Sequence, residues 1–228
     1  MRALFVVSIG APAARLIVVL AAAMLAITVP ASAQQTGERL PDRLGPATRA
    51  AIERVADSLR SAGLPDDPVY SKAAEGVLKG ADDARILLVV RSLAHELSDA
   101  RQALGSDAKA AEIVAGASAL HAGVPSAELR RMRDRQPRGS SASLAVPLTV
   151  MADLITRGVP ANDAAASVNA LLTRRVDDAE FQALRVGVER DITAGRPPGA
   201  AAQAWTERVL RNVPPAARQG VPRSEIPR

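Results

Sequence analysis

Apolar residues recur every three or four positions through most of residues 46–211, and this is the spacing of one face of an α-helix. Alanine, leucine and arginine, which all favour helices, dominate the region, and no stretch shows the two-residue alternation of a β-strand. The pattern therefore predicts an all-α fold. The expected helices span residues 46–62, 67–79, 82–104, 107–122, 125–135, 144–157, 161–174, 178–194 and 198–211.

A glycine followed two residues later by a proline stands at four junctions between these helices, at residues 63–65, 123–125, 158–160 and 195–197. Glycine adopts the left-handed conformation that ends a helix, and an apolar residue after it can pack back on the last turn. Proline then fits the first turn of the next helix. Because such short connections make neighbours antiparallel, we expect stacked antiparallel hairpins, as a short helical repeat or an orthogonal bundle.

A shift of 95 residues superimposes two parts of the chain without a gap. Gly63, Pro65 and the run 82–84 then fall on identical residues at 158, 160 and 177–179. The apolar residues that coincide are Ile86 with Phe181, Val89 with Leu184, Leu93 with Val188, and Leu97 with Ile192. We interpret 63–104 and 158–195 as an internal repeat of one hairpin, with 123–157 as a looser third unit. The alternative is chance similarity between alanine-rich helices.

Residues 1–33 have the layout of a cleavable signal peptide with an N-terminal signal helix. Arg2 and Arg15 precede an apolar run of 14 residues, Leu16–Val29, which one threonine interrupts. A membrane-spanning helix needs roughly 18–20 apolar residues. Ala31-Ser32-Ala33 supplies the small residues of a cleavage site. We expect cleavage after Ala33 and a bacterial periplasmic or secreted protein, which contacts the membrane only through this segment before cleavage. The alternative is a retained membrane anchor.

Composition limits the partners of the remaining chain. The formal net charge is +5, but residues 34–211 hold 24 basic and 23 acidic residues, so this body is nearly neutral and we expect no nucleic-acid partner. The chain has no cysteine, and packing alone must hold an exported fold together. Residues 34–45 are polar and aperiodic, which indicates a linker before the helical domain 46–211. Residues 212–228 contain four prolines and three arginines, which indicates a disordered basic tail.

The histidines are the first candidates for chemistry. His95, Glu96 and Asp99 resemble a zinc-protease helix in which aspartate replaces the second histidine. On a helix, however, His95 and Asp99 lie opposite the apolar stripe, which indicates a solvated charged face. His121 stands in the last turn of a predicted helix, where a cation is favourable. We therefore predict no metal, cofactor or catalytic residue, and a metal-dependent enzyme using His95 is a remote alternative.

Two further motifs occur in exported enzymes. Ser106 and Lys109 match the S-x-x-K motif of serine β-lactamases, and Ser167-Val168-Asn169 matches their second motif, but the third motif, K-T-G on a strand, is absent. Ser106 follows a glycine and is predicted to cap the next helix. The aspartate pairs at 66–67, 82–83 and 177–178 stand at predicted helix starts, which favours capping over a glycosidase site.

One local charge cluster is a candidate contact for an anionic partner. After export such a partner is a phospholipid head group, lipopolysaccharide or an acidic protein. The alternative is a solvated helix end and loop. The cluster consists of Arg130, Arg131, Arg133, Arg135 and Arg138.

The Gly-apolar-Pro joints and the helical pattern over most of residues 60–200 resemble uncharacterised exported bacterial all-helical proteins. This resemblance implies no known activity. We interpret the chain as a non-catalytic exported interaction or scaffold protein, whose partner is another envelope protein or an anionic envelope surface. The alternative is a Spy-type periplasmic chaperone or envelope-stress protein, although the Leu-Thr-x-x-Gln motif of that family is absent here.

Overall fold

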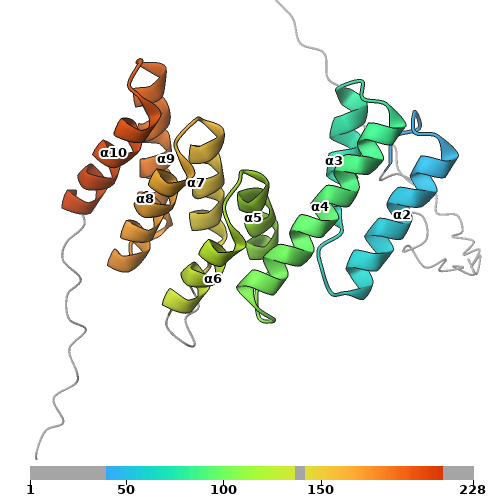
Figure 1. The fold of residues 1–228 in the computed structure, drawn as a ribbon, viewed down its shortest axis with the longest axis horizontal. Helices are drawn as coiled ribbons and strands as arrows, with labels where there is room; N and C mark the ends of the chain where they lie inside the picture. The colour runs from blue at the N-terminus through green and yellow to red at the C-terminus, as the bar shows by residue number, and fades with distance from the viewer. Residues whose placement is uncertain (1–39, 137–141, 213–228) are drawn as a thin grey trace, which may run out of the picture. The chain divides into compact units, whose positions relative to one another are not determined.

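The computed structural model describes residues 40–136 and 142–212, which fold into helices without a β-strand (Figure 1). The prediction of an all-α fold is confirmed for these residues, and every predicted helix is present. The bounds agree within one residue except at the start of α5. The helices are α2 (Pro46–Ser61), α3 (Asp67–Leu78), α4 (Asp83–Leu104), α5 (Ala110–His121), α6 (Ser126–Arg135), α7 (Ala145–Thr156), α8 (Ala161–Arg174), α9 (Asp178–Thr193) and α10 (Pro198–Asn212).

The predicted signal peptide, residues 1–33, lies outside the described residues, as does the predicted tail beyond Asn212. No helix within the described ranges combines the length and the apolarity that crossing a membrane requires. Part of the stretch expected as a linker packs on the helices. Leu40 and Leu44 are buried, and the backbone N–H of Gly45 donates to Asp83 Oδ2 at 2.9 Å. The packed body therefore includes residues 40–45.

The four Gly-x-Pro junctions end their helices as predicted. Gly63, Gly123, Gly158 and Gly195 have φ values of +68°, +96°, +89° and +91°. At the first junction the N–H of Leu64 donates to the carbonyl of Leu59 at 2.9 Å, which is the bond of a Schellman motif. The predicted place of the prolines in the first helical turn was wrong at three junctions, because Pro125 and Pro160 are the N-caps of α6 and α8, and Pro65 precedes the N-cap of α3.

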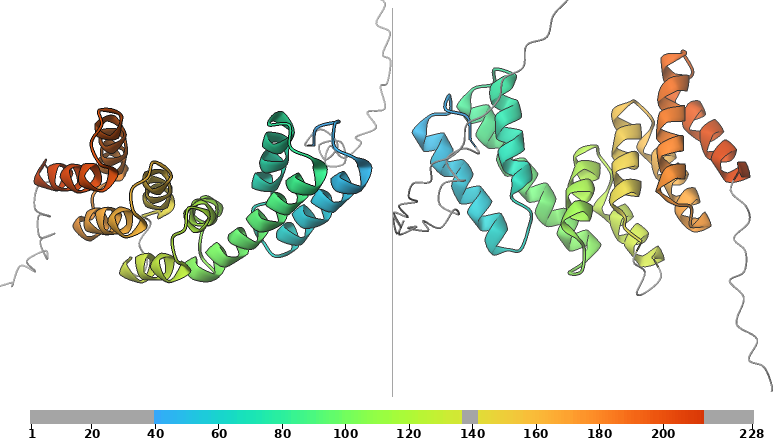
Figure 2. Two further views of the ribbon diagram at one scale, coloured as in Figure 1. Left: turned by 45° about the horizontal axis from the view of Figure 1, so that its top comes forward. Right: turned by 180° about the vertical axis from the view of Figure 1, so that it is seen from behind.

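Each helix packs mainly against helices one or two places away in the chain. One series of contacts links α4 with α6, α6 with α8, and α8 with α10, and a second links α5 with α7 and α7 with α9. Both views of Figure 2 show the helices following one another in chain order, and the most extensive contacts between consecutive helices are those of α4 with α5 and of α9 with α10. The core consequently runs along the whole series.

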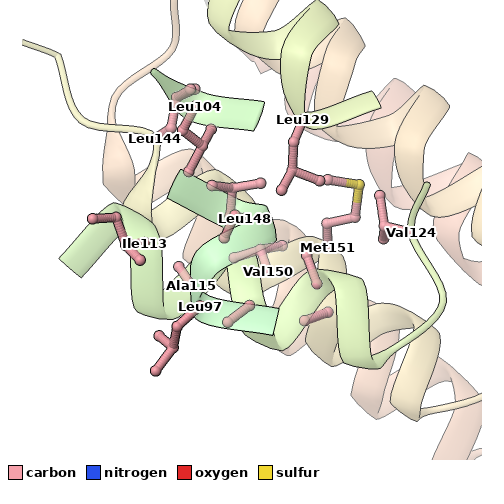
Figure 3. Packing of buried hydrophobic residues seen from close by; sticks show 14 of the residues in the cluster. Leu97, Leu104, Ile113, Ala115, Val124, Leu129, Leu144, Leu148, Val150 and Met151 are labelled. Atoms are coloured by element: carbon pink, nitrogen blue, oxygen red, sulfur yellow. The ribbon is translucent and has the colours of Figure 1, made fainter. Parts of the chain in front are cut away.

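The centre of this core is formed by α4, α5, α6 and α7 (Figure 3). Leu104, Leu129, Leu148 and Met151 come from different turns of α4, α6 and α7 and are all buried to 1% exposure or less. Gly116 of α5 permits the close approach of α4, because a Cβ at this position would lie 3.0 Å from Leu104 Cδ1. Truncating one of these buried leucines to alanine costs about 2–5 kcal/mol in typical cores.

The two predicted repeat copies share their turn structure. Gly80 and Arg175, which are 95 positions apart, both have positive φ values, of +72° and +54°. The next residue of each copy closes the same backbone bond, from Ala81 to the carbonyl of Gly76 at 3.0 Å and from Val176 to that of Leu171 at 3.4 Å. The common turns are what a duplication predicts, and the duplication itself stays a prediction.

The predicted apolar stripe needs correction in the first copy. Val89 and Leu93 are only half-buried, whereas Val90 is fully buried. Because α4 contacts α2, α3, α5 and α6, its buried face is turned from the face that α9 buries. In the second copy, Leu184 and Val188 are fully buried as expected, but Ile192 is only half-buried.

Candidate ligand-binding groove

A groove of about 1050 Å³ lies where α6 and α8 end and α9 begins. Leu172 and Val176 contribute partly exposed apolar surface, and Met132, Pro147 and Phe181 lie buried beneath it. Ligand sites in proteins are typically apolar concavities of about 300–1,000 Å³ with a few placed polar groups. The groove therefore has the size and lining of a binding site.

Arg175 stands at the rim of the groove in a strained conformation. It caps α8 with φ +54° and ψ +42°, and it is the only non-glycine residue with positive φ among the described residues. Left-handed backbone costs an L-residue about 1–2 kcal/mol, and the equivalent turn of the other hairpin uses Gly80 instead. Strain of this kind concentrates at functional sites, so Arg175 marks the groove as a candidate.

Charges of both signs surround the apolar lining. Arg135 and Arg175 contribute two positive charges, Asp177 and Asp178 contribute two negative charges, and all four residues are exposed. Asp177 also caps α9, since its Oδ1 accepts from the N–H of Ala179 at 3.0 Å. A hydrogen bond between the carboxyls of Asp177 and Glu180 lowers the pKa of Asp177 and raises the pKa of Glu180. The rim thus suits a ligand that carries both charges.

The arginine cluster expected from the sequence is not one patch. Arg131 donates to Glu128 Oε2 at 2.6 Å, and Arg133 donates to Asp107 Oδ2 at 2.7 Å, so internal carboxylates offset both charges. Arg130 and Arg133 line a separate cavity of about 590 Å³, whereas Arg135 lines the main groove. Arg138 lies outside the described residues. Successive helical positions point about 100° apart, which explains why neighbours in the sequence separate in space.

The residues of the metal hypothesis do not converge on one point. His95 and Asp99 are exposed on α4, while Glu96 Oε1 lies 3.0 Å from His121 Nδ1 at the end of α5. Across residues 40–136 and 142–212, no group of three or more histidine, cysteine, aspartate or glutamate side chains is arranged to hold a metal ion. His121 occupies the last turn of α5, as predicted.

Ser106 does not cap α5, contrary to the prediction. Its hydroxyl donates to Asp107 Oδ1, and the helix starts later, with Lys109 as its N-cap. Glu112 Oε2 accepts from the N–H of Lys109 at 2.9 Å, which fixes the later start. Ser106 and Lys109 are both exposed in this turn, so the S-x-x-K match does not form a nucleophile site on a helix.

Asp82 caps α4 as predicted, because its Oδ1 accepts from the N–H of Arg85 at 2.7 Å. The prediction was wrong for Asp66, whose side chain makes no cap bond to α3. It pairs instead with Arg60 at 2.6 Å.

Two buried glutamates were missed from the sequence. Glu112 is 9% exposed, and its Oε1 accepts from the N–H of Leu144 at 2.8 Å, which joins α5 to the start of α7. Glu128 is 8% exposed and accepts from Asn169 Nδ2 at 2.6 Å, which joins α6 to α8. No local pattern indicates the first, because lysine at the N-cap lacks the acceptor of a capping box, and the second depends on a residue 41 positions away.

Compared with known proteins, the sequence matches no family model, no curated protein and no solved structure.

Proposed function

We propose that this protein is a non-catalytic, exported helical-repeat protein that binds a polypeptide partner in the groove at the ends of α6 and α8. The repeat architecture is supported by contacts between helices one or two places apart in the chain. In such proteins each repeat packs only on its neighbours, and the resulting extended surface serves to bind partners.

The observation that carries the proposal is the groove itself. Its apolar lining suits an aliphatic or aromatic side chain, and its rim carries both the basic residues Arg135 and Arg175 and the acidic residues Asp177 and Asp178. An extended peptide presents apolar and charged side chains at a spacing of about 3.3 Å per residue. A peptide with one apolar residue between charges of opposite sign therefore fits both features.

A groove variant with a matched control tests this function. Thr173 is exposed in the groove, and Leu78, 95 positions earlier, is 88% exposed at the end of α3. Thr173→Arg places a long side chain in the groove, whereas Leu78→Arg makes the same addition outside it. We expect a partner captured from envelope extract by the mature chain to be lost with Thr173→Arg and kept with Leu78→Arg. Equal capture by both variants would contradict the proposal.

Export is tested separately, by the N-terminus of the protein recovered from the cell envelope. We expect intact-mass measurement to place it at Gln34, as cleavage after Ala33 requires. Recovery of the uncleaved chain in the membrane fraction would support the anchored alternative.

We also propose binding to an anionic envelope surface, through fewer arginines than the five of the sequence cluster. Arg131 and Arg133 are paired with Glu128 and Asp107, so binding to anionic vesicles would depend on Arg130 and Arg135 among the described arginines of this cluster. Equal vesicle binding by the wild type and the Arg130→Ala, Arg135→Ala double variant would remove this part of the proposal.

A further inference from the structure

The position at which α10 ends brings the following part of the chain close to the groove. Helices α8 and α10 are in contact, and both are joined to α9 by short connections that make them antiparallel to it. They therefore run in the same direction, as the neighbouring ribbons in Figure 1 show. Their starts touch, because a Cβ at Gly158 would lie 3.6 Å from Pro198 Cγ.

The two helices also have nearly equal lengths, 14 residues in α8 and 15 in α10. Asn212 consequently lies at the same end of the structure as Arg175. The sequence continues beyond Asn212 for 16 residues, which span at most about 50 Å when extended. This segment, residues 213–228, is long enough to reach the groove and lie in it.

The chemistry of the segment complements the groove. Residues 221–226 read Val-Pro-Arg-Ser-Glu-Ile, with apolar side chains at both ends and opposite charges between them. Arg223 is a counterpart for Asp177 and Asp178, and Glu225 is a counterpart for Arg135 and Arg175. The prolines of the segment favour an extended backbone, which lowers the entropy lost on binding.

We propose that residues 213–228 bind in the groove of their own chain and act as an internal competitor for the partner. This inference rests on the proposed function, because it takes the groove to be the partner site. A tethered segment acts at a local concentration of the order of millimolar, so even weak contacts keep a groove occupied. A partner must then displace the segment before it binds.

Disulfide formation in the full mature chain tests the proposal, and the absence of cysteine from the sequence removes any background. Ala179 is exposed and lines the groove, so the test protein carries Ala179→Cys and Ser224→Cys. Ala84, the exposed equivalent of Ala179 in the other hairpin, provides a matched control paired with Ser224→Cys. Glu207 is exposed near the end of α10, and Glu207→Cys paired with Ser224→Cys provides a second control. Its disulfide measures the rate that the covalent connection alone gives, without binding in the groove.

We expect the 179–224 disulfide to form at least about tenfold faster than either control, because bound residues hold the cysteines within the Cα distance of about 7 Å that a disulfide needs. Arg223→Glu should reduce the 179–224 rate to that of the 207–224 control and leave the control unchanged. A 179–224 rate no faster than the 207–224 rate, or one indifferent to Arg223→Glu, would overturn the proposal. If Thr173→Arg abolishes partner capture but the 179–224 disulfide forms no faster than the controls, the internal competitor is refuted and the proposed function stands.

Discussion

Replacing Gly187 with alanine tests how α10 packs on α9. Gly187 is buried, and a Cβ added there would lie 2.2 Å from Cδ2 and 2.4 Å from Cε2 of Trp205. Carbon atoms in contact are normally about 3.5–4.0 Å apart, so the indole must move by more than about 1 Å. The guanidinium groups of Arg190 and Arg208 lie 5.0 and 4.4 Å from the ring centre, and the movement disturbs these cation–π contacts as well.

The expected magnitude follows from two opposing effects. Overpacking of this kind costs about 1–3 kcal/mol, while replacing a helical glycine with alanine gains about 1 kcal/mol in helix propensity. We therefore expect Gly187→Ala to lower the free energy of unfolding by up to about 2 kcal/mol. For a domain of this size the melting temperature should fall by up to about 8 °C.

Urea unfolding followed by circular dichroism measures this loss, and fluorescence reports the ring directly because Trp205 is the one tryptophan of the chain. The control is the same substitution in a Trp205→Ala background, where no ring opposes the new methyl group. There Gly187→Ala should be neutral or stabilising by up to about 1 kcal/mol. A loss of the same size in both backgrounds would refute the packing argument.

Three further predictions concern carboxylates. Glu112→Ala should lower the free energy of unfolding by about 2–4 kcal/mol, as measured by urea unfolding, because it leaves two backbone N–H groups without their acceptor. Asp82→Ala and Asp177→Ala should each cost about 0.5–2 kcal/mol in the same assay as lost caps, and silence of both would contradict the helix starts. Hydrogen bonds from two lysines lower the pKa of Glu75 from 4.5 to about 2. Its stabilising contribution should therefore be present above about pH 4.5 and be lost as the pH falls towards 2, and an NMR titration of its carboxyl that gave an ordinary pKa would exclude this pairing.

The helices were predictable because local signals determine them. Apolar spacing sets the length of each helix, and a glycine with positive φ ends six of the described helices, including those before Gly63 and Gly158. The start of α5 was misplaced because a serine after a glycine is a common cap, whereas the side chain of Glu112 fixes the actual start. That side chain is held by bonds to α7, which no local pattern contains.

The groove could not be predicted, because it forms where the ends of separate helices meet. Arg135 was selected from the sequence as part of a charge cluster, but its groove neighbour Arg175 lies 40 positions away and was not. The left-handed conformation of Arg175 gave no signal, since an arginine at a helix end is ordinary. Glu128 and Asp107 pair with arginines of the cluster, and only the three-dimensional arrangement brings Asp107 to Arg133.

The most direct test of partner binding in the groove is site-specific photocrosslinking in the cell envelope. A photoreactive amino acid placed at Thr173 reports on the groove, and the same amino acid at Leu78 reports on the equivalent position outside it. We predict a discrete polypeptide adduct at position 173 that is absent at position 78. No polypeptide adduct at 173, or the same adducts at both positions, would contradict a partner-binding groove.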